Sequence, residues 1–291
     1  VYCFTQAGQA YYLRLTHISL RGETAILAAI AYQQHLFNQN VPVCEPILSA
    51  NHRWVEAIQQ GDEIFLAHVC RSVPGIPIDY NHKNLKLYYQ WGQALGKLHQ
   101  AAQSFDSKNF NYASWDKSLA ELHQYTQYEN EVIQKCLQEI DHYYMNRKQT
   151  QENYGLTHGD HREGNVLTDG KQVHIIDFDL PCMNWFMEDL VRPFFTAVIE
   201  NHNDYYSQLF AYLDGYFSVR PKTSIQLDAW AKQIQMKGLE IYLWMKNNWN
   251  SPTAPGGADI NIWLGQIYQI LSTTEWQDRL TKQIHSYNMK S

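Results

Sequence analysis

A stretch rich in proline and glycine, RSVPGIPIDY at residues 71–80, divides this sequence into two regions of different texture. Before it, short apolar runs bounded by turn residues are typical of strands, whereas after it apolar residues recur every three or four positions, as in amphipathic helices. Proline fixes its own backbone and lacks an N–H group, so the stretch is predicted to be a linker. We therefore predict a two-lobed α+β fold, with a small antiparallel-sheet lobe over residues 1–70 and a larger, mostly helical lobe over residues 71–291.

The first lobe is predicted to contain two β-hairpins and one helix. VYCFTQ and AYYLRL flank the short turn AGQ, and RWVEAI and EIFLAHV flank QQGD. Residues 22–38 are rich in Ala and Leu and contain no proline, which favours a helix. Because side chains alternate along a strand, Arg14 falls on the opposite face from Leu13 and Leu15.

The second lobe is predicted to be helical apart from one isolated β-hairpin. Helices are expected around residues 88–98, over residues 115–146 as one helix or two, and over residues 186–217, 225–248 and about 260–285. Between VLT and KQVHIID, Asp169–Gly170 is a signal for a two-residue turn. Antiparallel strands bring their outer ends together, so Asn165 before the first strand and Asp177 after the second are expected to lie close to each other.

Composition and charge disfavour several classes of protein. With 45% apolar and 18% charged residues the chain is expected to fold, and its net charge of −6, without a basic block, argues against nucleic acid or a membrane as a partner. No apolar run reaches the roughly 18 residues of a membrane span, and no leader is evident. Five scattered cysteines without a CxxC motif are typical of reduced thiols, so we expect a cytoplasmic protein; the oligomeric state stays open.

The polar residues around the predicted hairpin suit phosphoryl transfer from ATP. That reaction needs a carboxylate to orient the attacking hydroxyl group and oxygen ligands for Mg²⁺. Asp160 can orient the hydroxyl group, while Asn165 and Asp177 can bind the metal. His158 is better suited to holding the loop by hydrogen bonds than to proton transfer. Asp and Asn also favour turns, so each residue alone is compatible with a structural role, but the combination favours catalysis.

HGDHREGNV followed by IIDFD resembles the aminoglycoside phosphotransferase, choline kinase and homoserine kinase-like superfamily. The resemblance extends over IIDFDLPCMNWFMEDL and, more loosely, over VYCFTQAGQAYYLRL, NVPVCEPI and VPGIP. It implies a fold like that of a protein kinase, ATP and Mg²⁺ as cofactors, and a small-molecule hydroxyl acceptor such as an aminoglycoside, choline, homoserine or a similar amino alcohol.

The resemblance also implies roles for single residues. Asp160 corresponds to the catalytic base, and His158, which opens the same loop, is counted with it among the catalytic residues. Asn165 and Asp177 correspond to the metal ligands. Arg14 stands where the family places the basic residue that contacts the α- and β-phosphates, although a solvent-exposed Arg14 is the alternative. The adenine-binding hinge would be formed by Val69, Cys70 and Arg71.

Two departures from the family pattern favour an alternative function. The helix residue that pairs with the basic strand residue is usually Glu, whereas the expected position here is Ala29, and Glu23 lies six residues earlier. The phosphate-covering glycine loop is expected to precede Val1. A catalytically impaired pseudokinase or nucleotide-binding module is therefore the main alternative, while a Ser/Thr protein kinase is disfavoured because no APE-type segment follows IDFD.

Several residues after the hairpin are candidates for the acceptor site. Asp179, Trp185 and Glu188 are predicted to contact the substrate, since an acidic and aromatic lobe that also includes Asp204 and Asp214 suits an amine-bearing alcohol. Asp179 as a helix cap and Trp185 as a core residue are the structural alternatives. Asp189 is expected to cap a helix or to orient a loop as a hydrogen-bond acceptor, and His158, His161 and His174 do not match a usual zinc spacing.

Overall fold

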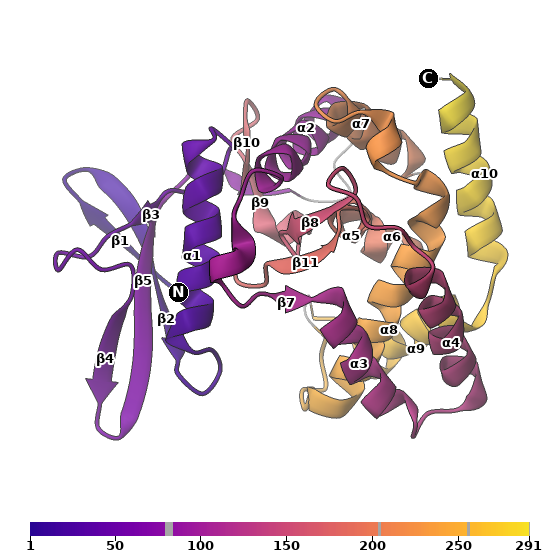
Figure 1. Ribbon diagram of the computed structural model, residues 1–291, viewed down its shortest axis with the longest axis horizontal. Helices are drawn as coiled ribbons and strands as arrows, with labels where there is room; N and C mark the ends of the chain where they lie inside the picture. The colour runs from indigo at the N-terminus through magenta and orange to yellow at the C-terminus, as the bar shows by residue number, and fades with distance from the viewer. Residues whose placement is uncertain (79–83, 203–204, 255–256, 291) are drawn as a thin grey trace.

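The computed structural model describes residues 1–78, 84–202, 205–254 and 257–290 of the 291-residue chain. Figure 1 shows a strand-rich N-terminal lobe beside a larger helical lobe, with helix α1 (Glu23–Asn38) between the sheet and the rest of the molecule. This arrangement confirms the predicted two-lobed α+β architecture. The predicted boundary at residue 71 stays a prediction, and residues 79–80 of the predicted linker lie outside the described residues.

An antiparallel sheet of five strands forms the N-terminal lobe. Its order is β1-β2-β5-β3, and β4 also pairs with β5, at residues 63–67, whereas β3 pairs with Val69 and Cys70. Both predicted hairpins are confirmed, because β1 pairs with β2 across the Ala7–Gly8 turn and β4 pairs with β5 across Gly61–Asp62. The strands are β1 (Tyr2–Gln6), β2 (Gln9–His17), β3 (Pro46–Ile47), β4 (Glu56–Gln60) and β5 (Glu63–Arg71).

Helix α1 packs against both lobes with opposite faces. Ile26 and Ile30 form a small cluster with Val55, which precedes β4, and with Leu66 of β5. On the other face, Tyr32 is fully buried in the main core and its hydroxyl donates a hydrogen bond of 2.7 Å to the carbonyl of Leu156. The helix is therefore fixed to the C-terminal lobe as well as to the sheet.

The C-terminal lobe contains nine α-helices within the described residues. They are α2 (Leu85–Ala102), α3 (Trp115–Thr126), α4 (Glu131–Met145), α5 (Met187–Val191), α6 (Phe195–Ile199), α7 (Tyr206–Phe217), α8 (Trp230–Asn248), α9 (Ile260–Ser272) and α10 (Glu275–Lys290). Helices α2 and α7 lie side by side (Figure 1). They approach closely because Gly92 of α2 has no side chain: a Cβ atom there would lie 1.8 Å from the carbonyl oxygen of Tyr212.

Two short sheets position the loop that carries the predicted site. One has the order β10-β9-β6 and the other β7-β11-β8. Their strands are β6 (Ile76–Pro77), β7 (Ala113–Ser114), β8 (Tyr154–Thr157), β9 (Val166–Thr168), β10 (Val173–Ile175) and β11 (Cys182–Trp185). The connections contain the 3₁₀ turns η1 (Ser107–Asn109), η2 (Glu163–Asn165), η3 (Arg192–Phe194), η4 (Lys222–Ser224) and η5 (Leu227–Ala229).

Three local predictions are wrong. The hairpin β9–β10 exists but is not isolated, since β6 adds a third strand. Its loop has four residues rather than two, because Thr168 pairs with Val173 and the Asp169 carboxylate accepts hydrogen bonds from two backbone N–H groups of the loop. The last predicted helix is two helices, α9 and α10, separated where Thr273 adopts an extended conformation.

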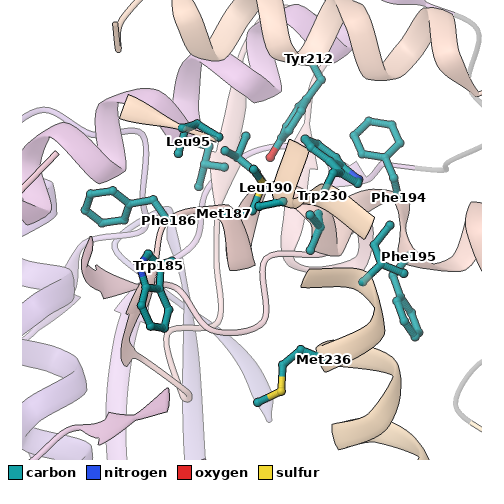
Figure 2. Packing of buried hydrophobic residues seen from close by; sticks show 14 of the residues in the cluster. Leu95, Trp185, Phe186, Met187, Leu190, Phe194, Phe195, Tyr212, Trp230 and Met236 are labelled. Atoms are coloured by element: carbon teal, nitrogen blue, oxygen red, sulfur yellow. The ribbon is translucent and has the colours of Figure 1, made fainter. Parts of the chain in front are cut away.

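The segment that follows β11 runs through the middle of the main core. Figure 2 shows Trp185, Phe186, Met187, Leu190 and their neighbours packed against side chains of other helices. Every residue from 184 to 195 is buried except Arg192. Among the residues that the structure describes, none of the helices has both the length and the apolar character that crossing a bilayer requires.

Candidate active site

The loop between β8 and β9 carries Asp160 and begins with a sharp bend at Gly159. Gly159 has φ of +82°, and a Cβ atom there would lie 1.8 Å from the Leu180 carbonyl oxygen. Both the left-handed backbone and the close approach require glycine. The bend turns the chain out of β8, so that Asp160 is partly exposed, with 27% of its side chain accessible, directly after this turn.

Three side chains hold the Asp160 carboxylate. Asn165 Nδ2 donates to Oδ2 at 2.9 Å and Arg162 Nε donates to the same oxygen at 3.1 Å. Arg192 Nη2 lies 3.2 Å from Oδ1. Each carboxylate oxygen therefore has a cationic neighbour, and the plane of the carboxylate is fixed by donors on both sides.

The ends of β9 and β10 bring Asn165 and Asp177 together, as the sequence predicts. Val166 pairs with Ile175, and the backbone N–H of Ile176 donates to the Asn165 carbonyl at 2.9 Å. Asp177 follows with φ of +65°, an uncommon conformation for a residue other than glycine. Such conformations are frequent where a side chain must be aimed at a functional site.

Asn165 and Asp177 offer the donor atoms that a hard divalent cation prefers. Asn165 is buried and its Nδ2 is engaged by Asp160, which leaves its Oδ1 for an ion. Asp177 keeps 34% of its side chain accessible. An amide oxygen and a carboxylate suit Mg²⁺, which retains several water ligands and needs few protein ligands. No group of three or more His, Cys, Asp and Glu side chains suited to a metal ion occurs within the described ranges.

Asp189 holds the backbone of the loop by accepting hydrogen bonds, as expected for a residue that orients the loop. Its carboxylate accepts the backbone N–H groups of His158 at 2.7 Å and Gly159 at 2.9 Å, and it lies 3.0 Å from His99 Nε2. Burial by itself would raise the pKa of Asp189, but the hydrogen bond from His99 and the neighbouring histidines lower it. This buried carboxylate is therefore ionised and rigidly paired.

His158 is a structural member of the loop. The side chain is fully buried, and its Nε2 lies 2.9 Å from the Ile176 carbonyl oxygen. His161 is also buried and accepts a hydrogen bond of 2.8 Å from the indole of Trp91. His158 thus links the loop to the segment that ends at Asp177, as expected for a residue that holds the loop.

Arg14 crosses from the N-terminal lobe to the segment after β10. Its Nη1 lies 2.8 Å from Asp177 Oδ1, and its Nη2 forms a second ion pair with Asp179. Arg21 also pairs with Asp179, at 3.0 Å. Burial raises the pKa of Asp179, although the two arginines oppose this shift. The alternative of a solvent-exposed Arg14 without partners is wrong.

The predicted hinge residues form the end of β5. Val69, Cys70 and Arg71 pair with β2, and Val69 and Cys70 also pair with β3. Arg71 Nε lies 2.8 Å from the Glu45 carboxylate. The three residues lead directly from the sheet into the connection to the second lobe, and their contact with adenine stays a prediction.

The structure corrects the predicted substrate contacts. Trp185 is fully buried, with Trp115 and Tyr144 rings each 4.8 Å away, so it belongs to the core. Glu188 is 3% exposed and pairs with Lys237 at 2.5 Å, and burial raises its pKa to about 8. Neither side chain is available to a substrate in this arrangement.

Two further acidic residues do not form the predicted substrate lobe within the described part of the chain. Asp179 is engaged by two arginines, and Asp214 accepts a hydrogen bond of 2.8 Å from the Tyr287 hydroxyl. Asp204 lies outside the described residues.

Sequence reasoning missed two arginines that contact the site. Arg162 stands two positions after Asp160 in the quoted motif, and Arg192 is the single charged residue in the apolar run LVRPFF. A lone arginine within such a run was the available signal, because a guanidinium is rarely buried without a partner. Arg21, which follows the predicted strand AYYLRL by a few residues, gave no comparable signal.

Comparisons with known proteins show what this chain is similar to. Residues 1–221 match the model of the phosphotransferase enzyme family. The amicoumacin kinase of Bacillus subtilis (strain 168) is 30% identical over 197 residues, which are 65% of this chain and 58% of that protein. The match therefore spans little more than half the length of this relative.

Solved structures establish the fold. Amicoumacin kinase hAmiN, in complex with AMP-PNP, Ca²⁺ and Ami, superposes with a TM-score of 0.76 at 21% identity over 95% of this chain and 84% of that chain. A microcompartment-associated aminopropanol kinase gives 0.69 at 17% identity, over 97% and 89%. A choline/ethanolamine kinase family protein from Mesorhizobium loti gives 0.65 at 15% identity, over 98% and 88%. The predicted protein-kinase-like fold is confirmed.

Proposed function

This chain belongs to the phosphotransferase enzyme family, and we propose that it transfers the terminal phosphoryl group of ATP to a hydroxyl group of a small molecule. The observation that carries the proposal is the arrangement of Asp160, Asn165 and Asp177. Asn165 donates directly to the Asp160 carboxylate, and its backbone accepts the N–H that precedes Asp177. Asp160 and Asn165 are thus in direct contact, and the backbone of Asn165 is bonded to the residue that precedes Asp177.

Asp160 is the group that faces the acceptor in this proposal. Its carboxylate orients the attacking hydroxyl group and accepts its proton, while Arg162 and Arg192 keep the carboxylate in place. Their guanidinium groups also offset the negative charge that a phosphoryl group brings beside a carboxylate. Positioning of this kind supplies much of the acceleration when the transition state is loose.

Asn165 and Asp177 are the side chains that would hold Mg²⁺. When bound, the ion neutralises phosphate charge and orients the terminal phosphate for transfer. Asn165 is already oriented by its two hydrogen bonds to Asp160, so its oxygen is fixed before any ion arrives. Arg14 reaches the same region from β2 and is proposed to contact the nucleotide phosphates.

We further propose that the acceptor is an alcohol that also carries an amine. The support comes from the similar proteins, which include an amicoumacin kinase, an aminopropanol kinase and a member of the choline/ethanolamine kinase family. The predicted contacts of Trp185 and Glu188 do not contribute to this argument, because both are buried. A cytoplasmic location fits the five cysteines, all of which are free thiols.

An ADP-release assay tests the proposal. The purified chain is incubated with ATP and MgCl₂ and with choline, ethanolamine, aminopropanol and amicoumacin in turn, and ADP is measured. We expect acceptor-dependent release with at least one amine-bearing alcohol and none when EDTA replaces MgCl₂. Release that is independent of every acceptor would contradict phosphoryl transfer to these alcohols.

A nucleotide-binding module without turnover is a second candidate, favoured by one observation. Asp177 forms an ion pair with Arg14. The side chain proposed to bind the metal and the side chain proposed to bind the phosphates are therefore paired with each other. Thermal unfolding with ATP, combined with the ADP-release assay, separates the two functions. ATP at 100 times its dissociation constant should stabilise either protein by about 2.7 kcal/mol, but only the kinase releases ADP.

A further inference from the structure

Helix α1 has no carboxylate where Arg14 needs a partner. Ala29 occupies the expected position and is 5% exposed, packed inside the protein. Glu23 lies in the first turn of the helix and is exposed. A guanidinium that must stay aimed at the site therefore has to be held by a group from elsewhere.

Asp179 supplies that partner from the C-terminal lobe. It stands two positions after Asp177, with 25% of its side chain accessible, and pairs with Arg14 through one oxygen. Its other oxygen, Oδ1, lies 3.0 Å from Arg21 Nη1. Both carboxylate oxygens are thus engaged by guanidinium groups of the N-terminal lobe.

Arg21 ties this carboxylate to the helix. Only 17% of the Arg21 side chain is accessible, and its Nη2 donates to the carbonyl oxygen of Ala25 at 2.9 Å. Ala25 lies in the first turns of α1, four positions before Ala29. A continuous series of contacts therefore runs from the helix backbone through Arg21 and Asp179 to Arg14.

We infer that Asp179 is a positioning residue that holds Arg14 toward the nucleotide phosphates and, through Arg21, does what a helix carboxylate at position 29 would do. The inference rests on the proposed function. Charge balance supports it, because two guanidinium groups face two carboxylates. If Asp177 turns to the metal ion, Arg14 loses one partner and keeps Asp179 as the other. A guanidinium held in one orientation loses less freedom when it binds a phosphate.

Nucleotide binding without turnover tests this inference. The full chain and its variants are titrated with ATP in EDTA, by calorimetry, and then with MgCl₂ at fixed ATP. We expect Asp179→Asn to weaken binding of metal-free ATP by at least about tenfold, as loss of a charge-assisted hydrogen bond does. Its half-saturating Mg²⁺ concentration should stay within about twofold of the wild type, whereas Asp177→Asn should raise that concentration by more than about tenfold.

A double-mutant cycle shows whether Asp179 acts through Arg14. Combining Asp179→Asn with Arg14→Gln should weaken ATP binding no more than Arg14→Gln alone, because the effect of residue 179 passes through the arginine. Additive losses would overturn the inference. Asp179→Glu should recover part of the affinity, and Asp62→Asn, an exposed aspartate in the β4–β5 turn, is the matched control that should bind ATP normally.

The outcomes separate this inference from the proposed function. A wild-type chain that binds no ATP contradicts the proposed function. A wild-type chain that binds ATP while Asp179→Asn binds it equally well contradicts only the positioning role. A raised Mg²⁺ requirement with unchanged metal-free affinity would make Asp179 a metal ligand instead. If Asp179→Asn fails to fold, Arg21→Gln replaces it, with an expected loss of about three- to fivefold in ATP affinity because one of the two guanidinium contacts is removed.

Discussion

Nη2 of Arg192 lies 3.2 Å from Oδ1 of Asp160, and Arg192 is the one residue between 184 and 195 that is not buried. Arg192 is thus the one partly exposed group that this buried segment places beside the Asp160 side chain. Asp189, three positions earlier, holds the backbone of the same loop. Two side chains of one short segment therefore fix both the main chain of the loop and the Asp160 carboxylate.

We predict that Arg192→Gln lowers kcat by about 10- to 100-fold, since a hydrogen bond between charged groups contributes about 1.5–3 kcal/mol. KM for ATP should change little, because Arg192 touches Asp160 rather than Arg14. Arg192→Lys should restore part of kcat, as it keeps the charge but lacks the planar fork. Steady-state kinetics with an identified acceptor measure both constants, and a change confined to KM would be inconsistent with the assignment.

Replacing Asp160 separates chemistry from nucleotide binding. Asp160→Ala should lower kcat by at least about 100-fold, because positioned proton acceptors contribute about 10²- to 10⁴-fold. The dissociation constant for ATP, measured by calorimetry, should stay close to that of the wild type. An equal loss of ATP affinity would assign Asp160 to the nucleotide site instead.

Asp189→Asn should destabilise the whole protein. An amide offers one acceptor oxygen where the carboxylate now accepts from His158, Gly159 and His99, and its NH₂ group would face backbone donors. We expect the free energy of unfolding to fall by about 3 kcal/mol, measured by urea denaturation. Asp214→Asn is the matched control. Asp214 is exposed and accepts only the Tyr287 hydroxyl among the contacts described, so its loss should stay below about 1 kcal/mol.

His68 predicts how stability depends on pH. Burial, together with the charges of Arg14 and Arg21, lowers its pKa to about 4 in the folded protein, whereas an unfolded histidine titrates near 6.5. The unfolded chain therefore takes up a proton first as the pH falls. The contribution of His68 to the free energy of unfolding is fully present above about pH 6.5. It falls by on the order of 2 kcal/mol as the pH decreases toward about 4. The unfolding free energy of His68→Gln should therefore differ less between about pH 7 and about pH 4.5 than that of the wild type, by roughly that amount. The same difference in the variant and in the wild type would contradict this prediction.

The contact between α2 and α7 predicts a contrast between two glycines. Gly92→Ala places a methyl group 1.8 Å from the Tyr212 carbonyl oxygen, so the helices must separate. We expect a loss of more than about 3 kcal/mol in unfolding free energy, or failure to fold. Gly265 of α9 has open space where an added methyl group would lie, so Gly265→Ala should be neutral or stabilising by up to about 1 kcal/mol. Thermal denaturation of both variants checks the contrast.

Local sequence signals predicted the parts of the site that depend on neighbouring residues. Asn165 and Asp177 meet because they flank one hairpin, and hairpin ends are fixed by pairing between nearby strands. The fold class followed from the change in apolar periodicity around residues 71–80. These features involve short separations along the chain, so alternation and turn residues were sufficient to predict them.

Features that depend on long-range packing were not predicted. Trp185 and Glu188 look suitable for a substrate in sequence, but whether an aromatic or acidic side chain faces a site or the core depends on helices far along the chain. Likewise, nothing near Ala29 indicates that its expected role is transferred to Asp179, and the break between α9 and α10 has no glycine or proline to signal it.

The two faces of helix α1 pack against clusters of buried apolar side chains of very different size. Only Ile26, Ile30, Val55 and Leu66 form the buried cluster between the helix and the sheet within the described residues, whereas Tyr32 anchors the opposite face in the main core. We therefore expect local unfolding to open the contact between the five-stranded sheet and the helix before the contact between the helix and the larger lobe. In such a partly open form Arg14 moves with β2, whereas Asp177 and Asp179 stay with the larger lobe, so the ion pairs between the lobes are broken.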